Sequence, residues 1–150
     1  MRFRERKCAA DKTLFSVLMS CLLLVSPLGA TTIFGMNIDE VAQGAEIIFE
    51  GKVVEHNIRE NDAGMIVTYV TFRIKELIKG EYDEQLLELK FTGGRLGERI
   101  MEVSGLRIPS PNEEGIYFVE SAYRNLVNPL LGWSQGHYLI YEQNGVRRVS

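Results

Sequence analysis

Residues 45–55, AEIIFEGKVVE, decide how this chain folds. Ile47, Phe49 and Val53 fall on one face of this stretch, and charged residues occupy the other face. Alternation with a period of two is typical of a β-strand that buries one face. Gly51 lies on the apolar face, where a glycine indicates a bulge or a strong bend of the kind that curves a sheet into a barrel.

The same alternation recurs along the rest of the chain. The predicted strands are residues 45–55, 66–77, 87–91, 98–103, 116–121, 137–142 and 146–150. The segment 56–64 is polar and ends in turn residues, and 105–114 carries two prolines, so both are expected to be loops. The pattern predicts an all-β fold with one short N-terminal helix, a small antiparallel OB-like barrel that is closed or nearly closed. The helix is expected at 37–44, capped by Asn37 or Asp39, and is expected to pack across the barrel.

The N-terminal segment has a different character. Five basic residues between positions 2 and 12 precede an apolar run at 14–25 and a small-residue end at Ala30. This order is typical of a secretory signal peptide, and the run is shorter than the ~20 residues of a membrane-spanning helix. We expect residues 1–30 to be a signal peptide and 31–150 a single exported β-barrel domain, periplasmic or extracellular, with no membrane span after cleavage.

Two alternatives for this segment stay open. The signal could be retained as an anchor, or the chain could be a lipoprotein tethered at Cys21, because residues 18–21 (LMSC) loosely resemble a lipoprotein cleavage box. The apolar run continues past Cys21 to Val25, where a lipoprotein normally turns polar. Cleavage after Ala30 is therefore the preferred interpretation.

Composition narrows the classes of function. Both cysteines, Cys8 and Cys21, lie in the predicted signal, so the mature domain would have no disulfide, thiol nucleophile or thiolate metal ligand. Residues 31–150 hold 12 basic and 18 acidic side chains, a net charge of −6. A protein that binds nucleic acid needs a positive surface to displace counterions from phosphates. We therefore expect no nucleic-acid partner.

Four short motifs resemble known exported proteins. Residues 45–53 resemble the first strand of netrin-like domains, which include the tissue inhibitors of metalloproteinases and fold as OB-type barrels. Residues 77–80 (LIKG), 93–94 (GG) and 132–136 (GWSQG) are similar to motifs of uncharacterised bacterial exported proteins of this style. The resemblance spans about residues 38 to 141 and implies an OB-type barrel.

The resemblance also has departures. The inhibitors chelate their target's zinc through a cysteine at the mature N-terminus, whereas this mature chain is expected to begin near Thr31. Their disulfides are missing, and residues 105–109 (GLRIP) stand where the bacterial proteins usually carry G-x-P. Zinc-chelating inhibition is therefore not implied.

No catalytic or metal-binding pattern stands out. His56 and His137 lack metal-ligand spacing and are expected to be surface or strand-edge residues, with no metal and no cofactor. Ser134 precedes His137 by three positions but lacks the context of a nucleophile. The acidic pair Glu113 and Glu114 is expected to be solvated in a turn. Enzymatic activity stays open, and a non-enzymatic function is favoured.

The loops at the ends of the barrel are the predicted functional surface. The candidate binding residues are Gly93, Gly94, Arg95, Trp133, Gln135 and His137. Trp133, the only tryptophan, either plugs an end of the barrel or anchors an interface. The leading hypothesis is an exported binding module that recognises a protein or a surface glycan. The alternatives are a peptidase inhibitor that works without zinc chelation, a small hydrolase using Ser134 and His137, and a structural envelope component.

Overall fold

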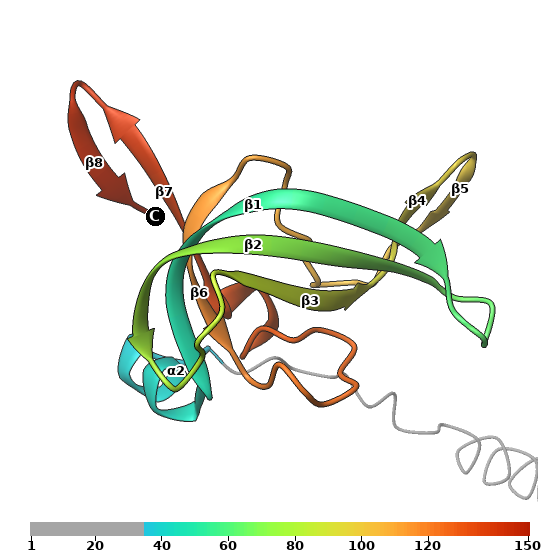
Figure 1. Cartoon of the computed structure of the whole chain (residues 1–150), viewed down its shortest axis with the longest axis horizontal. Helices are drawn as coiled ribbons and strands as arrows, with labels where there is room; N and C mark the ends of the chain where they lie inside the picture. The colour runs from blue at the N-terminus through green and yellow to red at the C-terminus, as the bar shows by residue number, and fades with distance from the viewer. Residues whose placement is uncertain (1–34) are drawn as a thin grey trace, which may run out of the picture. The chain divides into compact units, whose positions relative to one another are not determined.

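The computed structural model describes residues 35–150, and the predicted signal peptide and Cys21 lie outside this range. Its elements, shown in Figure 1, are α2 (Ile38–Gly44), β1 (Ile47–Glu60), β2 (Ile66–Lys79), β3 (Leu86–Thr92), β4 (Gly94–Leu96), β5 (Arg99–Met101), β6 (Glu114–Val119), the 3-10 helix η1 (Trp133–Gly136), β7 (His137–Gln143) and β8 (Val146–Val149). The mostly β class and the single short α-helix are confirmed for these residues. Neither helix in this range has the length and apolar character needed to cross a membrane.

The long strands form one strongly curved antiparallel sheet. Its strand order is β3-β2-β1-β6-β7-β8, and β4 pairs with β5 in a separate hairpin. In Figure 1 the two short hairpins, β4–β5 and β7–β8, project from opposite ends of this sheet. β1 is paired on both sides, with β2 and with β6.

The expected closed or nearly closed barrel is wrong. The outer strands β3 and β8 do not pair, so the sheet stays open. Beside β3 lies the segment that follows β6, where the Thr92 N–H donates to the Val127 carbonyl (2.9 Å). This segment lacks a period of two and contains Pro129, so it covers the strand without forming a full ladder.

β1 carries the bends that curve the sheet. Its register with β2 shifts at three places, one of them between Glu50 and Gly51, which confirms the predicted irregularity. A Cβ at Gly51 would lie 2.9 Å from the Arg73 carbonyl oxygen and 2.8 Å from a ring carbon of Phe49, so the close approach of the two strands requires glycine.

β1 also runs further than predicted. Residues 56–60, expected to be a polar loop, continue β1 because His56 and Ile58 pair with β2 positions Val70 and Thr68. The predicted turn follows directly, and the Asn61 Oδ1 accepts hydrogen bonds from the Ala63 N–H (3.1 Å) and the Met65 N–H (2.9 Å).

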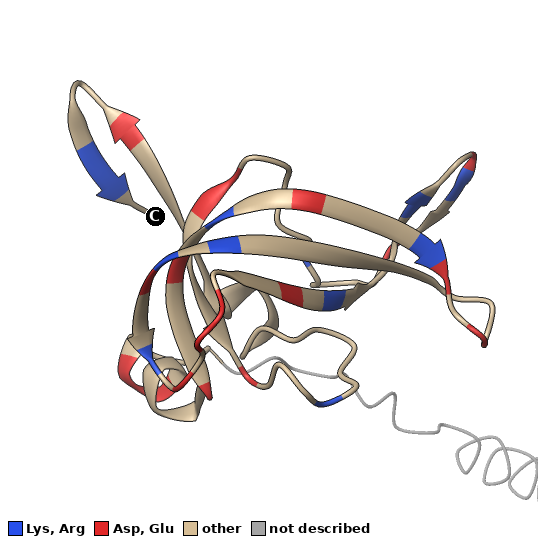
Figure 2. Cartoon of the chain, viewed as in Figure 1, with Lys and Arg blue, Asp and Glu red and all other residues tan. Residues whose placement is uncertain are grey.

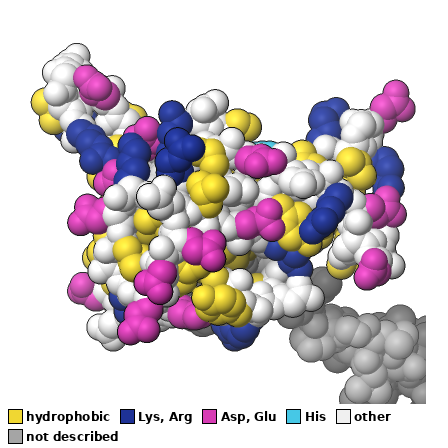
Figure 3. Space-filling model, viewed as in Figure 1, with side chains coloured by type: hydrophobic (Ala, Val, Ile, Leu, Met, Phe, Trp, Pro, Cys, Tyr) yellow, Lys and Arg dark blue, Asp and Glu magenta, His cyan; other side chains and the backbone are white. Residues whose placement is uncertain are grey.

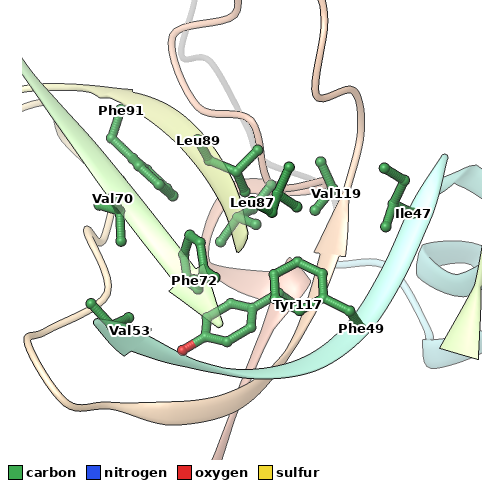
Figure 4. Close-up of a cluster of buried hydrophobic side chains, with 11 residues drawn as sticks. Ile47, Phe49, Val53, Val70, Phe72, Leu87, Leu89, Phe91, Tyr117 and Val119 are labelled. Atoms are coloured by element: carbon green, nitrogen blue, oxygen red, sulfur yellow. The ribbon is translucent and has the colours of Figure 1, made fainter. Parts of the chain in front are cut away.

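The concave face of the sheet holds the main hydrophobic core (Figure 4). At its centre Phe49, Phe72 and Tyr117, all fully buried, bring together three strands. Their ring centroids lie 5.5 Å (Phe49–Phe72), 5.2 Å (Phe49–Tyr117) and 4.6 Å (Phe72–Tyr117) apart. The other buried members are Ile47, Val53, Val70, Leu87, Leu89, Phe91, Val119 and Leu130.

Helix α2 covers the opposite face of the sheet. Val41 and Ala45 pack on Ile48 and Phe118, whose positions alternate with those of the inward-facing Phe49 and Tyr117. The expectation that this helix packs across a barrel is therefore wrong, because its apolar residues match the second apolar face of β1 and β6.

The N-terminus of α2 is capped as the sequence predicts. Asn37 is the N-cap and forms a capping box with Glu40, with both hydrogen bonds at 2.9 Å. The helix ends at Gly44, and Lys79 of the LIKG motif donates from its Nζ to the carbonyls of Ala42 (2.8 Å), Gln43 (3.0 Å) and Ala45 (2.7 Å). A cation at a helix C-terminus is favourable, so this lysine joins β2 to α2.

The aromatic centre gives the first prediction. Phe49→Ala removes a buried ring that packs on two others, and we expect it to lower the free energy of unfolding by about 3–5 kcal/mol. The matched control Tyr123→Ala removes a ring that is 76% exposed and should change it by less than about 0.5 kcal/mol. Urea unfolding followed by circular dichroism measures both, and equal effects would contradict the assignment of the core.

Candidate functional site

One end of the concave core is covered by the segment 105–113. Its end is held to β1 by two backbone hydrogen bonds, from the Val53 N–H to the Glu113 carbonyl (2.9 Å) and from the Asn112 N–H to the Val53 carbonyl (3.2 Å). Leu106 and Ile108 pack against the core, and Pro109 is buried. The predicted loop is therefore present and forms a fixed wall.

Four polar side chains meet beneath this wall. Glu113 Oε2 accepts a hydrogen bond from Arg107 Nη2 (2.5 Å), and Glu113 Oε1 lies 2.7 Å from His137 Nε2. Arg107 Nη1 donates to His137 Nδ1 (3.2 Å), since arginine has no acceptor. The His137 ring stacks on Tyr117 with centroids 4.8 Å apart. We call Arg107, Glu113, Tyr117 and His137 the polar cluster.

Burial sets the electrostatics of the polar cluster. The side chains of His137 and Glu113 are only 2% and 9% exposed, whereas that of Arg107 is 42% exposed. Desolvation lowers the pKa of His137; the Glu113 carboxylate opposes this shift and the Arg107 guanidinium reinforces it. Desolvation, together with Glu113, raises the pKa of Tyr117. At neutral pH the cluster therefore contains a neutral histidine and a protonated tyrosine.

Arg107 also faces the solvent, where it borders an open hollow of about 630 Å³. This hollow lies between the β4–β5 hairpin and the chain that follows it. It is lined by Thr92, Gly93, Gly94, Arg95, Ile100, Met101, Glu102, Val103, Ser104, Gly105, Leu106, Arg107 and Ile108. Figure 2 shows basic positions on β4 and β5, and Figure 3 shows apolar, basic and acidic side chains together at this end of the molecule.

The two glycines after β3 allow the hairpin to form. Gly94 has φ +129°, and a Cβ on it would collide with Thr68 Oγ1. That hydroxyl is buried and donates to the Gly93 carbonyl (2.7 Å). Residues 94–96, which the sequence pattern did not predict as a strand, form β4, and Gly94 lies directly against Thr68 of β2 and Ile58 of β1.

The six predicted binding residues do not share one place. Gly93, Gly94 and Arg95 line the hollow, and His137 reaches it through Arg107. Trp133 and Gln135 belong to η1, where the Gln135 Oε1 accepts from the Met36 N–H (2.6 Å) beside α2. Trp133 is half-buried rather than enclosed.

Two expectations about polar side chains are wrong. His137 is the first residue of β7, but its side chain is buried rather than at the surface, and Glu113 is buried in an ionic contact rather than solvated. The burial of Glu113 could have been predicted from the sequence. Side chains two positions apart in a strand lie on the same face, so Tyr117, Gly115 and Glu113 all face inward. Arg107 carried no such signal, because its position depends on an irregular loop.

The proposed serine–histidine pairing meets a geometric obstacle. Both ring nitrogens of His137 already face partners, Glu113 and Arg107. A base that activates Ser134 needs one of these nitrogens for the hydroxyl proton. Within residues 35–150, no three side chains of histidine, cysteine, aspartate or glutamate gather as ligands for a metal ion.

Comparison of the chain with protein families, curated proteins and solved structures finds no match. The likeness to netrin-like domains therefore rests on the short motifs alone. What the site can do follows from its own residues: an open hollow with a glycine-rich rim, two arginines, one glutamate and several apolar side chains.

The electrostatics of the polar cluster give the second prediction. Glu113→Gln removes the carboxylate that favours the charged ring, so the pKa of His137 should fall further below its ordinary value. Glu114→Gln, the adjacent control, alters a carboxylate that pairs with Lys75 on β2 and should leave the His137 titration unchanged. Proton NMR of the imidazole C–H signals measures both, and a rise in the Glu113→Gln variant would refute the arrangement.

Proposed function

We propose that this chain is an exported, non-enzymatic binding module that takes a protein ligand in the hollow beside the β4–β5 hairpin. The order of charge and apolar residues in the N-terminal sequence supports export. The observation that carries the proposal is the hollow of about 630 Å³, which has the size of a ligand site but is open to solvent. An open site suits a loop of a larger molecule.

The lining favours a protein over a glycan. Ile100 is 53% exposed, and Met101, Leu106 and Ile108 add apolar surface beside Arg95 and Arg107. Apolar and arginine side chains together are typical of protein interfaces. The hollow has no aromatic lining residue on which the apolar face of a sugar ring could stack, and Trp133 lies outside it.

The third prediction tests this site with a charge-reversed hollow. The double variant Arg95→Glu/Ile100→Asp should give the circular dichroism spectrum of the unchanged protein, because both side chains are exposed. The amount of ligand that it captures should fall by about tenfold or more. The probe is the exported protein fraction of the cells that make the chain, passed over immobilised protein. The matched control Arg148→Glu/Val149→Asp changes two exposed residues of β8 and should capture as much ligand as the unchanged protein.

Two further arms separate the alternatives. The Trp133→Ala variant should capture as much ligand as the unchanged protein. If it captures less, although its hollow is unchanged, the ligand binds at η1 instead. A glycan array should give no specific binding, and a specific sugar signal abolished by Arg95→Glu would replace the protein ligand with a glycan. If the hollow variant and the unchanged chain capture the same protein in equal amounts, the proposal is wrong.

A peptidase inhibitor is the narrower form of this function. The observation that favours it is the β4–β5 hairpin, which projects from the sheet in Figure 1 and has only the short turn at Gly97 and Glu98 at its tip. Such a hairpin has the shape of a wedge that enters a cleft. The test is to assay exported peptidases at saturating concentrations of the protein. If they keep full activity, the inhibitor function is excluded, and the broader proposal of a binding module is unaffected.

A further inference from the structure

The hollow and the buried histidine share one residue. Arg107 lines the hollow, and the same guanidinium contacts Glu113 and His137 in the polar cluster. Arg107 lies in the segment 105–113, which forms a wall of the hollow with its residues Leu106 and Ile108. Arg107 therefore connects His137 to this wall.

The contacts fit only the neutral ring. Arginine carries donors alone, so Nδ1 of His137 must offer a lone pair to Arg107 Nη1. Nε2, which lies 2.7 Å from the Glu113 carboxylate, then carries the single ring proton. Stacking on Tyr117 holds the plane of the ring, with an angle of 24° between the two rings. The neighbours thus select one tautomer and leave no acceptor opposite Nδ1 for a second ring proton.

A second proton would convert the contact with Arg107 from attraction to repulsion. Nδ1–H and the guanidinium are both donors and both cationic, at a separation of 3.2 Å between the nitrogens. The groups that act on the ring within residues 35–150 are Glu113 and Arg107 from the wall and Tyr117 from β6. Glu114 is bound to Lys75, and η1 carries no charged side chain.

We propose that His137 is a proton sensor for the hollow: protonation of its Nδ1 releases Arg107, loosens the segment 105–113 and weakens ligand binding in acid. The inference rests on the proposed function, since it concerns the regulation of the same hollow. Covalent chemistry is not involved, and the proton comes from the solvent.

The direction of the pH dependence follows from linkage. The closed wall lowers the pKa of His137 from its ordinary value of 6.5, and a released ring regains that value. The closed state is therefore fully stable above the ordinary value and loses stability as the pH falls through it toward the lowered pKa. Each unit between the two values makes opening about tenfold more favourable in acid.

The test is a pH titration of the purified protein without ligand, followed by NMR from about pH 8 to about pH 4.5, the range in which a histidine titrates. His56→Gln leaves His137 as the only imidazole, since the chain has two histidines. The His137 ring signal should titrate below 6.5, and the backbone amides of residues 105–113 should shift with the same midpoint and exchange faster in acid. Amides of the β7–β8 turn serve as the internal reference and should not follow.

Two variants make the test decisive. His137→Gln supplies an acceptor and a donor without titrating, so it should abolish the acid transition at residues 105–113. Arg107→Gln removes the opposing cation, so the pKa of His137 should rise while the segment no longer responds to its protonation. The second variant decides the question where the first fails to fold.

The outcomes separate this inference from the function it rests on. A ring titration that leaves the amides of residues 105–113 unchanged, or an acid transition that persists in His137→Gln, overturns the sensor even where neutral-pH ligand binding is intact. If no ligand binds at neutral pH but the NMR transition is observed, the binding function is wrong and the response of the segment to protonation of His137 is retained. Ligand binding that weakens in acid for the unchanged protein but not for His137→Gln supports both.

Discussion

The packing of Phe49, Phe72 and Tyr117 is the interaction on which the rest of the structure depends. Each ring comes from a different strand, so their contacts fix β1, β2 and β6 relative to one another on the concave face. Residues 35–150 contain no cysteine, and this domain therefore has no covalent cross-link to supplement its core. The register shifts along β1 are the geometric condition for this packing, because they let a long strand curve around the aromatic centre.

The same aromatic centre positions the candidate site. Tyr117 packs on Phe49 on the side of the core and stacks on His137 at the end where the wall lies. His137 in turn meets Glu113 and Arg107, and Arg107 reaches the hollow. A continuous series of contacts thus leads from the middle of the sheet to the surface, and each member is held by the one before it. The site is therefore built on rigid elements, although its rim is made of irregular chain.

The features predicted correctly from the sequence are those that depend on residues close together in the chain. The alternation around Phe49 and Phe72, the turn at Asn61 and the capping of α2 by Asn37 were readable because each depends on neighbouring residues. The failures share a different cause. Barrel closure, the burial of Glu113 and His137 and the ordering of β4 depend on contacts between segments distant in sequence, and no period marks those contacts. Of the hollow, the sequence identified the glycine rim and Arg95 but not Arg107, whose position is set by apolar anchors in a loop.

The buried contact of Glu113 with His137 and Arg107 lies beside the hollow, and the cost of burying it needs an explanation. Burying Glu113 and His137 carries a desolvation cost, and apolar residues of similar volume often give equal or greater stability in such places. The wall does not need them for attachment, because Leu106 and Ile108 pack on the core and two backbone hydrogen bonds tie its end to Val53. What the polar cluster adds to these attachments is a contact that responds to charge: an apolar wall is equally stable at every pH, whereas the contact between Arg107 and His137 suits the neutral ring. The wall that carries this contact borders the hollow, which is why we propose that the contact regulates ligand binding there.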